Sequence, residues 1–365
     1  MGAVFWGRGS ATTAPRVAWV DAGKGLAISL VVLFHSARWL DGLPSDTVVW
    51  QTVNDVLATL RLPLFFTLSG LFAAKWLVAP LAQLWNIKLR LFVWVLLLWS
   101  WIDLGPYWLG QYLHGTGVNI RRELWDTALS PLIPRFELWF VWALALFFLI
   151  NRALRRVPPA AIVVVAAGAS VVGFLDILPI PSPGWTGLLK YYVFFAVGTH
   201  FRVLVFAYAS RSGWVLRTLV IAVWAGCAIA VVHLGMQTVP GVMPILGVMG
   251  VLAGIAISQV LQRFTFVARL GARTLPVYLA HTAVIIMISS VVLLPGAEAV
   301  LAVMSPVYPP IVAVAAIVAS LALHRATAST PLRALFEPPR RFPVAHRTRP
   351  GPPGSRRSEG EASPT

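Results

Sequence analysis

Three ionisable residues stand in the first apolar segment of the chain, where their side chains could do chemistry. Asp21, Lys24 and His35 lie in a stretch that is otherwise almost wholly apolar. A charged side chain at the centre of a membrane helix costs at least ~2.5 kcal/mol, so each of these residues needs a compensating role. At 100° per residue, Lys24 and His35 share one helix face and lie ~16.5 Å apart along its axis. An imidazole on this face is a candidate general base.

A purely structural interpretation of these residues stays open. Asp21 and Lys24 can form an i,i+3 pair that eases insertion at the mouth of a helix, and His35 can extend towards the headgroups. We favour a chemical role for His35 because it shares the polar face with Lys24. Gly23 and Gly25 leave room beside Lys24 for another backbone or for a ligand.

The composition shows what kind of protein carries these residues. Of 365 residues, 58% are hydrophobic and only 12% are charged, about half the charged share of a soluble domain, which excludes a cytosolic globular enzyme. The net charge of +16 is spread between apolar runs, so no nucleic-acid partner is expected. The single cysteine, Cys227, lies in an apolar run, which excludes a disulfide framework and a thiol metal cluster.

Ten apolar segments have about the length that a membrane-spanning helix needs, ~20 residues. They are residues 17–40, 56–79, 85–104, 138–150, 160–177, 188–206, 214–233, 240–261, 271–294 and 300–323. The sequence therefore predicts an all-α polytopic membrane protein of about ten transmembrane helices. Placing both termini in the cytoplasm puts most Lys and Arg residues on the cytoplasmic side, as the positive-inside rule requires in an inner (plasma) membrane.

The chain divides into three predicted parts. Residues 1–15 form a cytoplasmic N-terminal tail, and residues 16–325 form the transmembrane domain. Residues 326–365 are rich in Pro, Arg, Ser and Gly, so we expect a disordered cytoplasmic tail whose charge could touch anionic lipid headgroups. Within the domain, residues 105–137 are predicted to form a long external loop, and loops of this length are often functional. No pair of Gly- or Pro-broken helices typical of inverted-repeat transporters is visible.

Further candidate residues lie on the second and third predicted helices. Ser69 and Gly70 follow Pro63, and we interpret them as a packing notch because Ser69 lacks the Gly-x-Ser-x-Gly pattern of a nucleophile. Lys88 and Arg90 stand at a cytoplasmic helix start. Positive-inside topology explains them, and a phosphate-bearing ligand would use the same residues.

A late apolar segment carries His281 and, three residues before it on the same helix face, Tyr278. An intramembrane histidine is either a functional residue or a satisfied structural one, and both interpretations stay open. The sequence has no zinc-ligand spacing, no Walker loop and no carboxylate pair placed for hydrolysis. We therefore predict no metal and no bound cofactor.

In four stretches the sequence resembles the bacterial integral-membrane acyltransferase 3 family, whose members O-acylate extracytoplasmic glycans and other acceptors. The resemblance covers about residues 16–325 and depends on four stretches in the family's order. They are Arg16 to Ser36, Leu62 to Phe72, Leu138 to Phe140, and Leu270 to His281. The sequence departs from the family at two places. The basic charge before the third helix sits on Lys88, with Ile87 preceding Arg90, and Glu137 stands where a His often precedes the Leu-Trp-Phe stretch.

The resemblance implies a set of site residues. His35 looks like the catalytic histidine, and Lys24 occupies a position where members have arginine or lysine. Asp21 could orient Lys24, and we predict that Asp21, Lys24 and His35 are the catalytic residues. Eight further residues are predicted to bind substrate: Ser69, Gly70, Lys88, Arg90, Glu137, Trp139, Tyr278 and His281.

The resemblance implies transfer of an acyl group, with acetyl expected, from cytoplasmic acyl-CoA to a hydroxyl of an extracytoplasmic or lipid-linked glycan. In this hypothesis Lys24, Lys88 and Arg90 meet the CoA phosphates, and His35 deprotonates the acceptor. A second hypothesis is a transporter or flippase for a polar metabolite or glycan intermediate, whose path the ionisable intramembrane residues would line. A third is a non-catalytic sensor whose basic tail recruits a partner.

Overall fold

The computed structural model describes residues 17–39, 47–113, 115, 117–180, 182–292, 307–339 and 341–344. The described part is 81% helical and contains no strand, which confirms the predicted all-α class. Five helices are long and apolar enough to cross a membrane, or up to seven when each of two bent pairs counts as one span. The full count of ten and the cytoplasmic position of both termini stay predictions.

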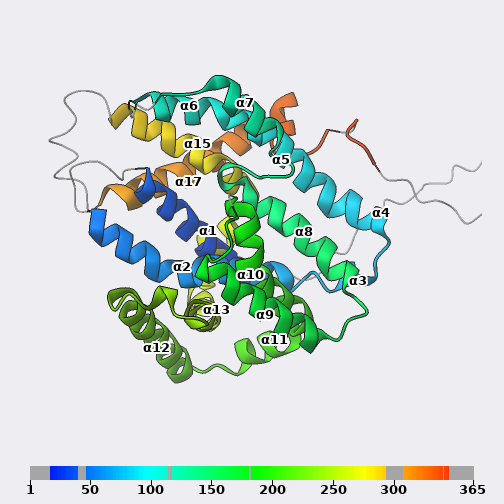
Figure 1. Cartoon of the computed structure of the whole chain (residues 1–365), viewed down its shortest axis with the longest axis vertical. Helices are drawn as coiled ribbons and strands as arrows, with labels where there is room; N and C mark the ends of the chain where they lie inside the picture. Colours follow the sequence, from blue (N-terminus) through cyan, green and yellow to red (C-terminus); the bar gives the residue numbers. More distant parts are fainter. Residues whose placement is uncertain are drawn as a thin grey trace, which may run out of the picture.

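The helices form one bundle with α1 near its middle (Figure 1). In chain order they are α1 (Ala18–Arg38), α2 (Thr47–Gly70), α3 (Lys75–Val78), α4 (Leu81–Leu84), η1 (Trp85–Leu89), α5 (Arg90–Ile102), α6 (Leu104–Leu113), α7 (Ile120–Ala128), η2 (Phe136–Leu138), α8 (Trp139–Ala153), α9 (Pro159–Leu175), α10 (Pro183–His200), α11 (Arg202–Arg211), α12 (Trp214–His233), η3 (Met236–Thr238), α13 (Val242–Leu261), α14 (Thr265–Gly271), α15 (Thr274–Val292), α17 (Tyr308–Thr327) and η4 (Pro331–Leu335).

Most apolar segments form helices close to their predicted limits, and α12 has the predicted limits. The second span is shifted, because α2 begins at Thr47 and ends at Gly70 instead of covering residues 56–79. The polar residues at its start do not break the helix. Its end follows from packing, since a Cβ at Gly70 would lie 2.3 Å from the Phe195 carbonyl oxygen of α10.

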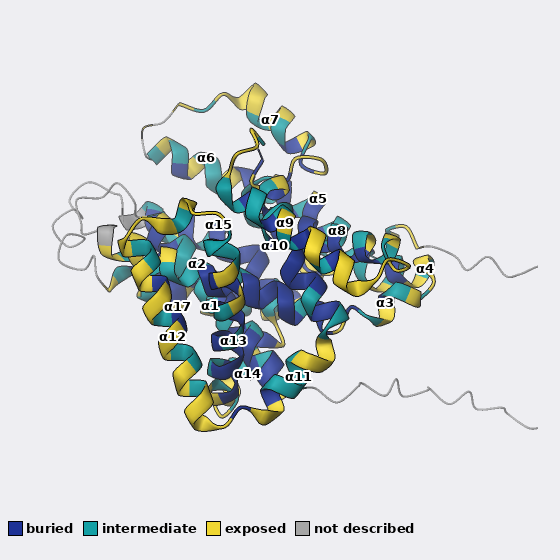
Figure 2. Ribbon diagram, turned by 60° about the horizontal axis from the view of Figure 1, so that its bottom comes forward, coloured by how far each residue is buried: buried dark blue, intermediate teal, exposed yellow. Residues whose placement is uncertain are grey.

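The outer surface of the bundle is apolar along several helices. Figure 2 shows the buried residues gathered at the centre and many exposed residues on α12. Trp214, Val215 and Leu219 of α12 are more than half exposed, and only Trp224 and Ala228 of this helix are buried. Such continuous apolar exposure is typical of a surface that faces lipid.

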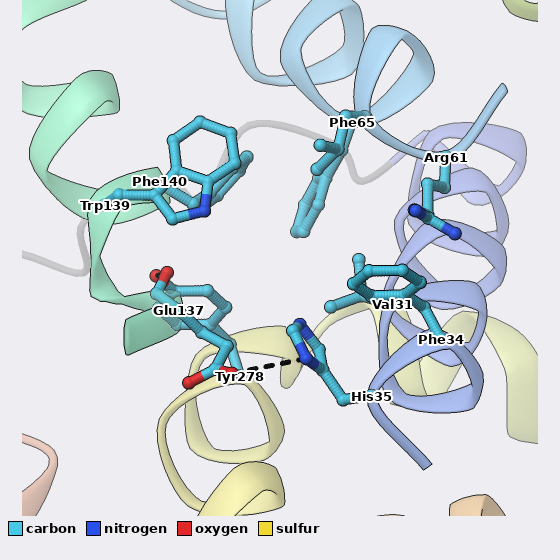
Figure 3. Close-up of a pocket in the computed structure, with 10 residues that line it drawn as sticks. Val31, Phe34, His35, Arg61, Phe65, Glu137, Trp139, Phe140 and Tyr278 are labelled. Atoms are coloured by element: carbon cyan, nitrogen blue, oxygen red, sulfur yellow. Dashed lines mark hydrogen bonds and ion pairs between the residues drawn. The ribbon is translucent and has the colours of Figure 1, made fainter. Parts of the chain in front are cut away.

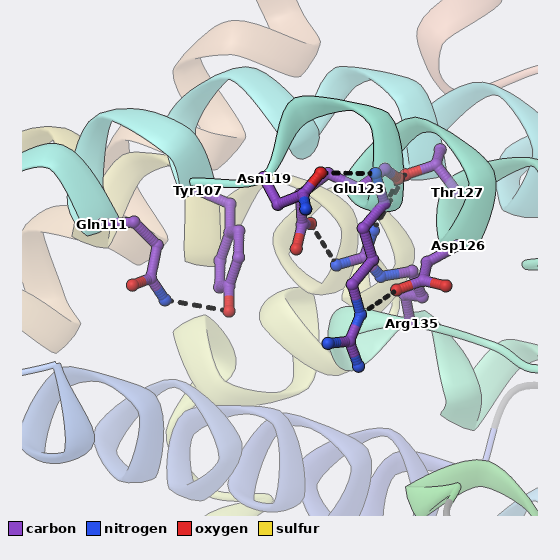
Figure 4. A network of polar contacts seen from close by, with 8 residues as sticks. Tyr107, Gln111, Asn119, Glu123, Asp126, Thr127 and Arg135 are labelled. Atoms are coloured by element: carbon purple, nitrogen blue, oxygen red, sulfur yellow. Dashed lines mark hydrogen bonds and ion pairs between the residues drawn. The ribbon is translucent and has the colours of Figure 1, made fainter. Parts of the chain in front are cut away.

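Residues 105–137, predicted to be a loop, instead hold two helices, α6 and α7 (Figure 4). The Asn119 side chain caps α7 by accepting from the Arg122 amide at 3.1 Å. Arg135 returns to α7, where its guanidinium lies 2.5 Å from the Glu123 carboxylate and 3.0 Å from the Thr127 hydroxyl. A mixture of charged and apolar residues looks like a loop on a hydropathy scale, although it suits a helix that packs by one face.

Two helices are sharply bent, which the sequence did not indicate. The axis turns by 77° between α10 and α11, and by 84° between α14 and α15. Both bends lie at the end of the bundle where α1 begins. A Cβ at Gly271 would lie 1.6 Å from the Asp21 carbonyl oxygen, and one at Gly198 would lie 2.2 Å from that of Thr67 on α2. Both changes of helix direction therefore occur at this end of the bundle and not at its centre.

The first residues after α17, which include the short helix η4, pack against the bundle. The expectation of disorder from residue 326 was therefore wrong for this part of the tail. The indole N–H of Trp94 donates to the Ala334 carbonyl at 2.6 Å, and that of Trp99 donates to Leu335 at 2.7 Å. Phe336 is buried. The tryptophans of α5 supply donors that the tail's own composition could not reveal. Residues 1–16 and 345–365 lie outside the described residues, so the remaining predictions for the two tails are untested.

A glycine substitution tests the close approach of α1 and α14. Gly271→Ala should destabilise the protein by about 3 kcal/mol or more, because backbone surrounds the new methyl group and cannot give way. Gly168→Ala on α9, where the methyl group meets no atom within 4 Å, is the matched control and should change stability by no more than about 1 kcal/mol. Thermal unfolding in detergent measures both, and equal effects would contradict the packing.

Candidate functional site

A pocket of about 80 Å³ lies where α1, α2, α8 and α15 meet (Figure 3). Its lining combines a histidine, a carboxylate, an arginine and several aromatic rings. The lining residues are Val31, Phe34, His35, Arg61, Leu62, Phe65, Glu137, Trp139, Phe140 and Tyr278. Four predicted site residues are therefore brought together: His35, Glu137, Trp139 and Tyr278.

A carboxylate holds the His35 ring. Nδ1 of His35 lies 3.2 Å from Oε1 of Glu137, and the two side chains are 16% and 17% exposed. The Thr282 side chain also hydrogen-bonds the Glu137 carboxylate. When Nδ1–H donates to the carboxylate, Nε2 is free to accept a proton. Figure 3 shows this second nitrogen directed towards the pocket.

The turn that carries Glu137 is fixed from α15. Phe136 has a φ of 50°, a left-handed conformation that costs a non-glycine residue about 1–3 kcal/mol. The Tyr278 hydroxyl donates to the carbonyl oxygen of Glu137 and lies 3.4 Å from the Val141 amide. Tyr278 thereby positions the start of α8, and with it the carboxylate that contacts His35.

His281 lies beside the pair without lining the pocket. Its ring centroid is 5.2 Å from that of His35. Its Nδ1 contacts the carbonyl oxygens of Val277 at 3.1 Å and Tyr278 at 2.8 Å within its own helix. A ring nitrogen that donates to a carbonyl oxygen of its own helix is typical of a structural histidine. His281 also packs against the His35 ring and limits its orientation.

Arg61 lies in the pocket wall, and the sequence did not single it out. Its guanidinium lies over the Phe34 ring, 4.0 Å from the centroid, and the residue is only 7% exposed. An arginine inside an apolar segment is itself a signal of function, and this signal was available beside the Pro63 stretch.

A second polar cluster lies at the opposite end of α1. It includes Lys24, Lys75 and Lys88, whose charges are near enough for Lys24 and Lys75 to influence Lys88 electrostatically. Asp21 acts on the charge of Lys24, whose ammonium lies 5.5 Å from the Phe72 ring. Asp21 and Lys24 are thus near each other as predicted, but they are separate from the pocket that holds His35.

Three predicted substrate-binding residues lie elsewhere. Arg90 donates to the Pro339 carbonyl at 2.7 Å, because residues two apart on a helix face different sides and Lys88 takes the other side. Ser69 donates to the Phe65 carbonyl of its own helix at 2.8 Å, and Gly70 contacts α10. Ser69 and Gly70 therefore fit the packing interpretation. Across the described ranges, no group of three or more His, Cys, Asp or Glu residues could hold a metal.

Residues 17–325 match the model of the acyltransferase 3 family, which is described as an acyltransferase domain. The chain is 26% identical over 220 residues to the nodulation protein NolL of Mesorhizobium japonicum. That match covers 57% of this chain and 52% of the nodulation protein, so the chain spans about half the length of this relative. No solved structure matches the chain.

A double-variant cycle tests the contact between His35 and Glu137. His35→Ala should destabilise the protein by about 1–3 kcal/mol, since it leaves a buried carboxylate without its partner. Adding Glu137→Gln should recover part of that loss, giving a coupling energy of about 0.5 kcal/mol or more. Thermal unfolding in detergent reports the values, with His233→Ala at the end of α12 as the control. Strictly additive effects would show that the two side chains do not interact.

Proposed function

Because the chain belongs to the acyltransferase 3 family, we propose that it moves an acyl group from cytoplasmic acyl-CoA to a hydroxyl of an extracytoplasmic or lipid-linked glycan. Acetyl is the expected group, and the plasma membrane is the expected location. The observation that carries the proposal is the His35–Glu137 pair in the pocket wall. An imidazole with a carboxylate on one nitrogen and open space at the other is the arrangement of a general base.

The pair supports direct transfer to the acceptor. Nε2 of His35 takes the hydroxyl proton while the acceptor oxygen attacks the thioester carbonyl. The new carbon–oxygen bond replaces the carbon–sulfur bond, and the CoA sulfur leaves with the proton that the imidazolium returns. The Glu137 carboxylate keeps the ring oriented and stabilises the imidazolium between the two proton transfers.

The lysine cluster at the other end of α1 supports binding of the donor's phosphates. The charges of Lys24 and Lys75 act on Lys88, and the Asp21 carboxylate acts on Lys24. Phosphate groups would relieve the repulsion between the lysines. Eleven residues separate Lys24 from His35, a distance of ~16.5 Å that the pantetheine arm would bridge along α1.

The arm must displace side chains to follow this route. Ile28 and Val31 lie on the same face of α1 between Lys24 and His35, and both are buried. The space predicted beside Gly23 and Gly25 is also filled, by Leu68 of α2 and by Val267. Donor binding therefore involves an opening along α1, for which the adjoining bend between α14 and α15 is a suitable hinge.

The transporter hypothesis has less support, although the bent helices are of the kind that transporters use. In such proteins the breaks lie near the membrane midplane and surround the substrate. Here both bends lie at the end of the bundle where α1 begins, and the pocket residue nearest to a break, Tyr278, lies about one turn into α15. The pocket residues come from unbroken stretches of helix and from the turn before α8.

Substitutions in the pair test the proposed chemistry. His35→Ala should abolish transfer from acetyl-CoA while the protein still inserts and folds. Glu137→Gln should lower kcat by about 100-fold with KM nearly unchanged, because it loses the orienting carboxylate and not a substrate contact. Labelled acetyl-CoA followed by mass spectrometry of envelope glycans and lipids measures both. Full activity of His35→Ala would remove the general-base role.

Substitutions in the lysine cluster test the donor site. Lys24→Gln and Lys88→Gln should each raise KM for acetyl-CoA about tenfold, the effect of losing ~1.4 kcal/mol of binding. Arg90→Gln is the matched control and should leave this KM unchanged, since Arg90 bonds Pro339.

A second donor sharpens that experiment. S-acetylpantetheine carries no phosphate, so the two lysine variants should use it as well as the unsubstituted protein does. If the two lysine variants lost the same activity with both donors, the lysines would contribute to folding and not to phosphate binding.

A further inference from the structure

Arg61 is a buried cation for which the described residues provide no ion pair. Its side chain is 7% exposed, and its one hydrogen bond, to the Asn54 carbonyl, is long at 3.4 Å. The Asp55 carboxylate and the Tyr191 hydroxyl act on it from a distance, and Asp55 itself is exposed. A guanidinium has five N–H donors, and burying it in an apolar interior is costly unless they find acceptors. Arg61 lines the wall of the His35 pocket, where a bound group could supply such acceptors.

The Phe34 ring separates Arg61 from the reacting position. The guanidinium carbon of Arg61 is 4.0 Å from the centroid of the Phe34 ring. The Phe34 and His35 rings are packed in a T-shaped arrangement, with 4.8 Å between their centroids. A donor that stabilised the reaction's oxyanion would have to lie within hydrogen-bond reach of the carbonyl that the His35-activated hydroxyl attacks. Because the Phe34 ring lies between Arg61 and His35, Arg61 is placed to bind an anionic group of the same molecule that carries the hydroxyl. That group would lie about the width of one ring from the hydroxyl.

The donor does not supply this anion. Its phosphates belong at the lysine cluster, and the pantetheine arm that would reach His35 carries no charge. The remaining source is the acceptor. Phe65, Trp139 and Phe140 add aromatic rings to the same pocket. Phe65 and Phe140 stack on each other, with 4.8 Å between their centroids, so a sugar ring would contact the parts of these rings that line the pocket while its polar groups reach charged side chains.

We propose that Arg61 binds a negatively charged substituent of the acceptor, so that the acylated unit is an acidic sugar carrying a carboxylate or a phosphate. This inference rests on the proposed function and narrows its acceptor. Arginine suits the role because its planar fork matches both anions with two parallel hydrogen bonds. The position of Arg61 across Phe34 then sets which hydroxyl of that sugar faces His35.

Binding of small sugars to the full chain in detergent tests the proposal without acyl transfer. Methyl glucuronide should bind at least tenfold more tightly than methyl glucoside, by calorimetry or thermal shift, and Arg61→Gln should remove the preference. Glucose 6-phosphate is a second anionic probe that separates phosphate from carboxylate recognition. Arg38→Gln is the matched control, because Arg38 lies 6.0 Å from the same Phe34 ring but is exposed, and it should keep the preference.

Each outcome decides the matter. Equal binding of the acidic and neutral sugars by the unsubstituted protein, or a preference that survives Arg61→Gln, would overturn the proposal. Should Arg61→Gln fail to fold, Arg61→Lys keeps the charge without the fork and should retain a weakened preference. Acetyl-CoA hydrolysis by the same preparation reports on the proposed function separately. A preparation that binds glucuronide through Arg61 but never consumes acetyl-CoA would contradict the transferase and leave the acidic ligand standing.

Discussion

The contact between the His35 imidazole and the Glu137 carboxylate joins the C-terminal part of α1 to the turn before α8. Placing two ionisable groups in an apolar bundle is expensive, and each lowers the cost of the other only while the geometry is kept. The surrounding structure keeps it. Tyr278 bonds the turn before α8, Thr282 bonds the carboxylate, and His281 packs against the imidazole. Side chains of α15 and the turn before α8 therefore fix the orientation of one ring on α1.

The bundle places its two polar sites at opposite ends of a single rigid helix. α1 packs against α2, α13, α14, α15 and α17, and the glycines at its inner end let α14 approach its backbone. A helix held on so many sides fixes the separation of Lys24 and His35. That separation suits a long, flexible donor whose charged and reactive ends are far apart, and it explains why α1 carries ionisable residues at both ends and few between them.

Segments outside the core complete the architecture by polar contacts as well as by apolar burial. α6 and α7 lie at the end of the bundle where α1 ends, and Arg135 links α7 to the turn that precedes Glu137. The residues after α17 lie along α5, where indole N–H groups and Arg90 donate to backbone carbonyls. Backbone carbonyls accept such bonds whatever the side chains are, so these contacts leave little trace in the sequence.

The sequence by itself determined the helical class, the limits of helices such as α12, the common face of Lys24 and His35, and the family. These depend on hydropathy and on a 3.6-residue period, which are local properties of the chain. Only the tertiary structure decided that Glu137 is the partner of His35, that Arg61 shares their pocket, that Lys75 joins Lys24 and Lys88, and that Arg90 faces away. The sequence also did not predict three features of the fold: the bends, the helices within residues 105–137 and the packing of the first tail residues against α5. Each depends on which distant segments pack together, and that is set by side-chain fit across the bundle, which no local pattern encodes.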